Sequence, residues 1–361
     1  MRPMLFATLA ALAALPALPA AFSHVFDQAT GAAQTWLFVT LVQPALWHLH
    51  MMDMDDLAYD GLLWVVYGAL QVLLLYLVLR PLEWLAPLER WENRRGIGAD
   101  VIYTLVNRLG LLPLILFLTL QPLFDLALAW LHLHGLDNLN LDALWPGMSL
   151  HPLVGFLIYL VVLDFAGYWY HRLQHQIGWW WELHSVHHCQ RKLSLWADDR
   201  NQLLDDALQA AFFATLALFI GVPPGQFVAL SLLGGALQSV QHANIRFGFG
   251  RIGERLLVGP RFHRLHHAVG FGHALGHGNR ARLYGCNFGV LLPWWDMLFG
   301  SADFSTPVQP TGVRAQLPAP EGAGEDYGEG LWAQQALAFV RIGARVARAL
   351  RGATAAAQAT P

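Results

Sequence analysis

The sequence predicts an all-α fold, an integral membrane helical bundle, and three observations support this prediction. Of 361 residues, 55% are hydrophobic and 13% are charged, about half the charged share of an average soluble domain. Several long apolar segments carry no charge. Trp (15) and Phe (20) are abundant, as in proteins whose rings anchor helices at a lipid interface. With a net charge of −3, the composition excludes a disordered chain and a nucleic-acid binder with a basic surface.

The first 60 residues are predicted to hold an N-terminal hydrophobic segment and then a periplasmic or lumenal stretch. Residues 4–22 are apolar and follow a Met-Arg-Pro start. They fit either a signal peptide or an uncleaved anchor helix. Leu18 stands where a small residue would precede the cleavage point, which favours the anchor.

The core spans follow in order. Residues 61–79 are uncharged and form about 28 Å of helix, enough to cross a bilayer core of ~30 Å. A second apolar stretch covers 109–130, so residues 61–150 are expected to hold the first two core helices. A third covers 152–170. The segment 207–240 is broken by Gly-Val-Pro-Pro-Gly at 221–225, which predicts a helical hairpin.

The arginines predict the orientation of these spans. Residues 23–79 and 131–170 contain no Lys or Arg, whereas arginines recur at 80–108, 172–200 and 246–264. By the positive-inside rule the arginine-rich loops face the cytoplasm. We therefore expect a multi-pass protein, in the inner membrane if the source is bacterial, with a cytosolic helical cap that contains residues 171–277.

The C-terminal region has a different composition. Residues 302–330 are rich in Pro, Gly and acidic residues and are expected to form a flexible linker. Residues 331–361 are expected to form an amphipathic helix and a tail, with Arg341, Arg345 and Arg348 on one face. Such a helix fits a position on the membrane surface, and it equally fits a solvated tail.

Histidine is concentrated in the predicted cap, where 11 of the 17 histidines lie between His171 and His277. Three boxes stand out: HxxxH at 171–175, HxxHH at 184–188 and HxxHH at 263–267. Residues three and four apart share a helix face, so each box presents its imidazoles in one direction. Imidazole is a ligand of transition metals. The eight predicted metal-binding residues are His171, His175, His184, His187, His188, His263, His266 and His267.

Eight ligands exceed what one ion accepts, so we expect two metal ions close together. Catalytic zinc uses three protein ligands, whereas many neutral nitrogen donors suit a redox-active pair such as iron. Cys189 and Cys286 are read as structural cysteines. Two cysteines give neither a disulfide framework nor a zinc ribbon.

The boxes resemble those of the fatty acid hydroxylase/sterol desaturase superfamily of membrane di-iron oxygenases. The resemblance extends beyond histidine, to Asp164 ahead of Tyr-Trp-Tyr-His171-Arg172 and to Trp181-Glu-Leu-His184. It includes Gln241-His242-Ala-Asn244, Pro260-Arg-Phe-His263, Asn287-Phe-Gly289 and Trp295-Asp296-Met-Leu-Phe-Gly300. It covers about residues 155–301, so 151–301 is expected to be the catalytic domain.

The resemblance implies two iron ions, with dioxygen as co-substrate, that hydroxylate or desaturate an unactivated C–H bond of a lipid drawn from the bilayer. It adds His242 to the ligands. No HPGG-type haem-binding segment occurs, so the electron donor is expected to be separate, of ferredoxin or cytochrome type. A non-catalytic metal-binding or transport membrane protein remains the alternative, although the spans carry few ionisable residues.

Two departures from the family pattern qualify the resemblance. Residues 200–203 are Arg-Asn-Gln-Leu rather than Arg-x-His-Pro, which is weakly closer to the alkylglycerol monooxygenase branch. A glycine-rich insertion at 270–278 adds His273 and His277, which fit either additional metal ligands or exposed loop histidines.

Asp164 lies two helical turns before His171 and therefore on the same face. It is expected either to orient a ligand histidine or to pair with an arginine.

Overall fold

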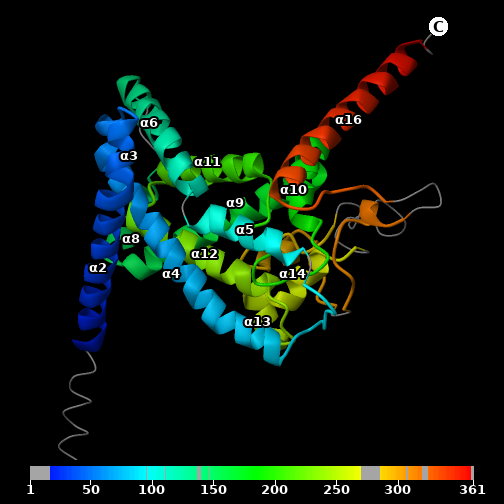
Figure 1. Cartoon of the computed structure of the whole chain (residues 1–361), viewed down its shortest axis with the longest axis horizontal. Helices are drawn as coiled ribbons and strands as arrows, with labels where there is room; N and C mark the ends of the chain where they lie inside the picture. Colours follow the sequence, from blue (N-terminus) through cyan, green and yellow to red (C-terminus); the bar gives the residue numbers. More distant parts are fainter. Residues whose placement is uncertain are drawn as a thin grey trace, which may run out of the picture. The chain divides into compact units, whose positions relative to one another are not determined.

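The computed structural model describes residues 17–94, 96–109, 111–135, 140–145, 147–269, 285–305, 308–318 and 324–358. Figure 1 shows the helical character of the chain. No β-strand occurs among the described residues, where the β-pairing consists of an isolated bridge between Ala268 and Thr311. The predicted all-α fold is confirmed.

The chain divides into two compact units. The first comprises residues 1–70 and 108–121. It contains α2 (Ala17–Leu37), the short helices η1 (Phe38–Val42), α3 (Gln43–His48) and η2 (Met52–Met54), and the first half of α4 (Asp55–Leu85). The side chain of Gln34 on α2 donates to the carbonyl of Tyr59 on α4 at 2.8 Å, which ties these two helices together.

The second unit comprises residues 71–107 and 122–361. Its helices before the histidine boxes are the rest of α4, α5 (Ile97–Arg108), the second half of α6 (Leu111–Leu133), α7 (Leu141–Leu144) and α8 (Gly147–Leu150). Those from the boxes onward are α9 (Pro152–Gln176), α10 (Gly178–His188), α11 (Leu203–Ile220), α12 (Pro224–His242), α13 (Gly250–Leu256), α14 (Pro260–His266), α15 (Trp294–Leu298), η4 (Arg314–Gln316) and α16 (Leu331–Gln358).

Among the described residues, three helices are long and apolar enough to cross a membrane: Met52–Leu85, Pro152–Gln176 and Leu203–Ile220. They contain the predicted spans 61–79 and 152–170 and the first arm of the hairpin. A shorter apolar helix, Pro122–Leu133, lies at the end of the second predicted stretch. The number of crossings and their direction stay predictions.

The predicted hairpin is present as two helices, α11 and α12. Gly221 ends α11 with a φ of 77°, a left-handed conformation that glycine adopts without a Cβ penalty. Pro224 is the first residue of α12, where the missing N–H costs nothing. Tyr159 of α9 donates to the carbonyl of Gly221 at 3.0 Å, so the turn is fixed to the helix that carries the first box.

An apolar core joins these three helices. Tyr159 and Leu163 of α9 pack with Ala217 and Ile220 of α11 and with Leu230 of α12. The apolar packing stabilises the helix pairs and leaves the polar ends of α9 and α12, which carry histidines, close to the other boxes.

A candidate dimetal centre

Four helices deliver the nine predicted histidines to one buried region. The first box lies on α9, the second on α10, His242 at the end of α12 and the third box on and directly after α14. All nine side chains are at most 8% exposed. The helix ends place them together because α10 contacts α9, α12 contacts both α9 and α14, and Pro260 starts α14 just before its box.

The histidines form two groups, in each of which the candidate ligand nitrogens lie within 4.8 Å of one another. The five-histidine group contains His171, His175, His184, His188 and His266. The four-histidine group contains His187, His242, His263 and His267. The second and third boxes contribute to both groups, so neither group corresponds to one box.

The two groups are neighbours. The ring centroids of His188 and His267, one from each group, are 4.2 Å apart, and those of His263 and His266 are 5.4 Å apart. Two separate ligand sets in contact are the arrangement that a pair of metal ions requires, and nine nitrogens exceed the six positions of a single octahedral ion. The geometry therefore fits the prediction of two ions.

Backbone carbonyls fix the ring orientation of four of these histidines. Nδ1 of His187 lies 3.2 Å from the carbonyl of Arg200, and Nδ1 of His242 lies 2.8 Å from that of Gln238. His171 and His266 make the same contact with Phe288 and Cys286, at 2.9 and 2.7 Å. Because a carbonyl oxygen only accepts, Nδ1 carries the proton and Nε2 presents its lone pair.

The four-histidine group brings such lone pairs face to face. Nε2 of His242 is 3.2 Å from Nε2 of His187 and 3.0 Å from Nε2 of His263. With both Nδ1 atoms protonated, the lone pairs of His187 and His242 repel unless a cation lies between them. Nitrogens on adjacent positions of an octahedral ion, with bonds of about 2.1 Å, are about 3.0 Å apart. The residues present therefore fit a bound metal ion.

Burial keeps these ligands neutral. It lowers the pKa of His187, His263 and His267 well below the ordinary value, and the neighbouring histidines lower each pKa further. A metal ion binds only the neutral imidazole. The group is thus in its metal-binding protonation state at neutral pH.

Aromatic side chains cover the five-histidine group. The ring centroid of Phe288 lies 5.2 Å from that of His175, and Trp181 lies 5.1 Å from His175 on another side. Phe288 is 2% exposed. These rings help to bury the five-histidine group.

The sequence suggested that Asp164 either orients a ligand histidine or pairs with an arginine. Its contacts in the structure differ from both. Its carboxylate accepts from the backbone N–H groups of Leu291 and Leu292, at 2.8 and 3.1 Å, and from Trp295 Nε1 at 2.9 Å. These donors belong to the segment after Phe288, so Asp164 holds that segment to α9. Its effect on a histidine passes through the Phe288 carbonyl, which accepts from His171.

Asp296 holds the same segment from its other end. The carboxylate accepts from the N–H groups of Phe288 and Gly289, at 2.9 and 2.6 Å, and from the Ser301 hydroxyl at 2.6 Å. A Cβ on Gly289 would lie 2.9 Å from this carboxylate and 2.8 Å from the Leu292 carbonyl, so the close approach requires glycine. Burial raises the pKa of Asp296 to about 6.

Arg200, in the loop between α10 and α11, supports the four-histidine group and is itself held by α5. Its guanidinium forms a buried ion pair with Asp100 of α5 and donates to the Gly96 carbonyl at 3.1 Å, while its own carbonyl orients His187. In the sequence, Arg200 begins the Arg-Asn-Gln-Leu segment, which departs from the family pattern Arg-x-His-Pro after its arginine. Asp100 has no motif around it, and sequence reasoning missed it.

The C-terminal helix packs against α10, the helix of the second box, which the sequence did not predict. Figure 1 shows α16 beginning beside α10, and the two helices are in contact. Glu182, within the second box region, pairs with Arg341 at 3.3 Å and Arg345 at 2.8 Å. Arg341 also lies 4.1 Å over the ring of Tyr327. Arg341 and Arg345, which the sequence placed on one face of a surface or tail helix, are therefore both partners of α10.

The remaining predicted site residues are His273 and His277, which lie outside the described residues. Cys189 and Cys286 are both free and buried. The sulfur of Cys189 contacts the Val186 carbonyl at 3.0 Å, in keeping with the structural reading.

Residues 156–301 match the Fatty acid hydroxylase family. No solved structure matches. The chain is 26% identical to ornithine lipid hydroxylase OlsE from Rhizobium tropici, over 63% of this chain and 64% of that protein. It is 28% identical to human alkylglycerol monooxygenase, over 46% of this chain and 33% of that protein.

A further relative is the putative Delta(7)-sterol-C5(6)-desaturase 2 of Arabidopsis thaliana, 33% identical over 40% of this chain and 46% of that protein. The chain thus aligns with just under two thirds of the ornithine lipid hydroxylase and a third of the human monooxygenase. The family match at residues 156–301 contains all nine histidines. The chain thus contains a fatty acid hydroxylase family domain at residues 156–301, and its relatives are a lipid hydroxylase, a monooxygenase and a putative sterol desaturase.

Proposed function

We propose that this protein is a membrane-bound non-haem di-iron oxygenase that hydroxylates or desaturates an unactivated C–H bond of a lipid. The observation that carries the proposal is the pair of adjoining histidine groups with opposed Nε2 lone pairs. The relatives support the lipid substrate, since their names specify an ornithine lipid, an alkylglycerol and a sterol.

Each histidine group would hold one iron ion. His171, His175, His184, His188 and His266 would hold one, and His187, His242, His263 and His267 the other. Nitrogen donors without thiolate suit iron as well as zinc, and the pairing of ions favours the redox metal. Bound iron would supply the activation of dioxygen.

The chain's own residues do the remaining work. Backbone carbonyls hold His171, His187, His242 and His266 in the tautomer that binds metal. Asp164 and Asp296 fix the segment that supplies the Phe288 carbonyl, and Phe288 and Trp181 exclude water. A precisely held ligand set lowers the cost of reorganisation during the reaction.

Both hydroxylation and desaturation require electrons from a reductant. Hydroxylation converts one C–H bond and one dioxygen molecule into an alcohol and one water, and consumes two electrons and two protons. Desaturation removes two hydrogen atoms and yields two waters with the same two electrons. We propose that an external ferredoxin- or cytochrome-type donor supplies the electrons.

The proposal places the dimetal centre on the cytoplasmic face of a multi-pass protein. The alternating arginine-rich loops support this topology by the positive-inside rule. The exposed apolar side chains of α9, including Leu153, Leu157 and Phe165, face the bilayer in this arrangement, and a lipid would approach from that side.

Two measurements test the function together. Metal analysis of the purified full chain should find two iron ions per chain, and cells that contain the protein should accumulate a hydroxylated or desaturated lipid. With ¹⁸O₂, a hydroxylated product should gain one labelled oxygen atom. Full occupancy by zinc alone, with no oxygen-dependent product in a lipid comparison, would instead indicate the non-catalytic metal-binding alternative.

A further inference from the structure

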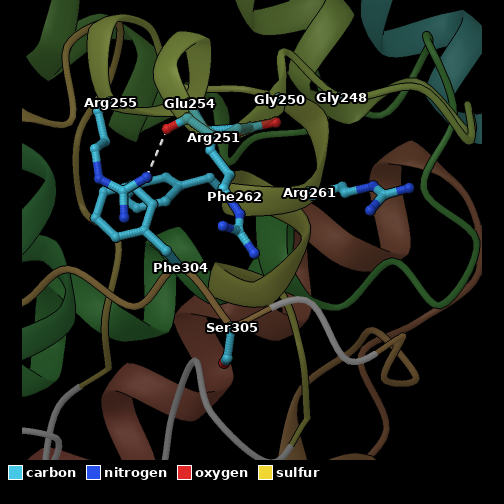
Figure 2. A pocket seen from close by; sticks show the side chains of 9 residues that line it. All are labelled: Gly248, Gly250, Arg251, Glu254, Arg255, Arg261, Phe262, Phe304 and Ser305. Carbon is cyan, nitrogen blue, oxygen red and sulfur yellow. Dashed lines mark hydrogen bonds between the residues drawn. The ribbon is translucent and has the colours of Figure 1, made fainter.

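A cavity of about 660 Å³ lies outside the histidine centre, at α13 and the start of α14. Figure 2 shows it from close by. Its lining consists of Gly248, Gly250, Arg251, Glu254, Arg255, Arg261, Phe262, Phe304 and Ser305. Three guanidinium groups and two aromatic rings therefore surround the space, with a single carboxylate among them.

The carboxylate in the cavity belongs to Glu254, and it already accepts a hydrogen bond from the backbone. Oε1 of Glu254 accepts from the N–H of Phe249 at 3.1 Å. A Cβ placed on Gly259 would lie about 2.4 to 2.6 Å from the carboxylate, so Glu254 also lies tightly against that glycine. The positive charge of the cavity thus exceeds its negative charge, and the cavity suits an anion.

Arg255 is held in place before any ligand binds. Its Cζ lies 4.6 Å over the ring of Phe304, and its Nη1 donates to the Arg251 carbonyl at 2.5 Å. In Figure 2 the Arg251 side chain projects toward Ser305, while Arg255 lies against Phe304. A planar guanidinium that is already oriented loses little entropy on binding, and its geometry matches a phosphate group.

An exposed apolar stripe adjoins the arginines on α13. Ile252 is 78% exposed and Leu256 is 54% exposed, one position after Arg251 and Arg255 respectively. Residues four apart share a helix face, so α13 presents an arginine stripe beside an apolar stripe. Trp294 donates from Nε1 to the Arg255 carbonyl at 3.1 Å, which joins α13 to α15, where Leu298 is 68% exposed.

We propose that this cavity binds the phosphate of an anionic membrane phospholipid, while the apolar stripe of α13 enters the acyl boundary. Charge identifies the headgroup, because Arg251, Arg255 and Arg261 complement a phosphate. The apolar stripe identifies the source as a lipid in a bilayer, since helices with this pattern lie in the membrane interface. The proposal is independent of the oxygenase chemistry.

The first test measures headgroup binding to the purified full chain in detergent. The probes are dihexanoylphosphatidylglycerol, dihexanoylphosphatidylcholine and inorganic phosphate. We expect the anionic lipid to bind most tightly, and Arg251→Gln/Arg255→Gln to weaken it about 30-fold, from about 1 kcal/mol per arginine. Arg251→Lys/Arg255→Lys retains the charge and should lose less. The exposed pair Arg348→Gln/Arg351→Gln is the control, with a change of under about twofold.

Several results would overturn the proposal. Equal weakening in the control pair would show a non-specific charge effect, and unchanged binding in the cavity pair would place the lipid elsewhere. Equal affinity for inorganic phosphate would make the cavity a site for a free anion rather than a lipid. Unfolding midpoints of all variants should match the wild type, and the lysine pair keeps the test valid if the glutamine pair does not fold.

The second test measures how deeply α13 lies in the lipid bilayer. A nitroxide is attached at Ile252→Cys, and the protein is placed in anionic nanodiscs. Molecular oxygen in the bilayer should then relax the nitroxide spin strongly, and a water-soluble nickel chelate should relax it weakly. The native cysteines are buried, so the label should react mainly at residue 252. Strong relaxation by the nickel chelate would place α13 in water and would favour an acidic protein partner, which contradicts the proposal.

Discussion

Glu182 accepts two hydrogen bonds from the guanidinium of Arg345, at 3.0 Å from Nε and 2.8 Å from Nη2, across 163 residues of sequence. Arg341 approaches the other carboxylate oxygen at 3.3 Å. Glu182 is 6% exposed, so the carboxylate depends on these two partners. The pairing fixes the C-terminal helix to the helix of the second box.

Replacing Glu182 should therefore loosen α10 from α16. We expect Glu182→Gln to lower the free energy of unfolding by about 1.5–3 kcal/mol, the range for hydrogen bonds to charged groups. Arg345 is 43% exposed, and solvent screens part of its contribution. Chemical unfolding in detergent measures the loss. The exposed Glu329→Gln serves as the control, and an equal loss there would refute the proposed role of Glu182.

Removing one histidine from each group should separate the two ions. We expect His187→Ala and His266→Ala each to lower the iron content by about half, since one ligand set is broken in each variant. Oxygen-dependent activity should be lost in both, and membrane insertion should be unchanged. Metal analysis and product analysis measure these effects, with the exposed His151→Ala as control. Near-normal turnover in either variant would contradict the ligand assignment.

The ion pair of Arg200 and Asp100 predicts a strong asymmetry between single and double variants. Arg200→Met leaves Asp100, which is fully buried, without its cation. The free energy of unfolding should fall by about 3–5 kcal/mol. Asp100→Asn/Arg200→Met removes both charges and should recover part of that loss. The single variant Asp100→Asn completes the comparison. If the loss in the double variant equalled the sum of the losses in the two single variants, the two residues would not be coupled.

Asp296 predicts a pH dependence of stability. Its pKa is raised from 3.8 to about 6 by burial, so the folded protein binds this proton more tightly than the unfolded chain does. The stabilisation is fully present below about pH 4 and is lost as the pH rises to about 6. The free energy of unfolding of the wild type, relative to Asp296→Asn, should thus fall by about 3 kcal/mol from about pH 4 to pH 7.

Chemical unfolding of both proteins across this pH range measures the difference, and subtracting the variant cancels the titration of all other groups. Glu329→Gln, at an exposed position, should show no such trend. A difference that stays constant with pH would mean that Asp296 titrates near its ordinary value.

The sequence by itself determined the helical membrane class and the histidines that meet. Uncharged apolar segments and the spacing of the boxes report local properties, namely the cost of placing charge in lipid and the face of a helix. His242 has no local pattern, and only its resemblance to a family element pointed to it. The structure places it within 3.2 Å of two box histidines.

The tertiary structure alone decided which histidine joins which group, because box membership and group membership differ. It also assigned Asp164 to backbone donors of the 291–292 segment rather than to a histidine or an arginine. The arginines of α16 became partners of Glu182, and Asp100 became the partner of Arg200. Each of these pairs joins residues far apart in sequence. Their meeting depends on how helices pack, which helical periodicity and local spacing do not encode.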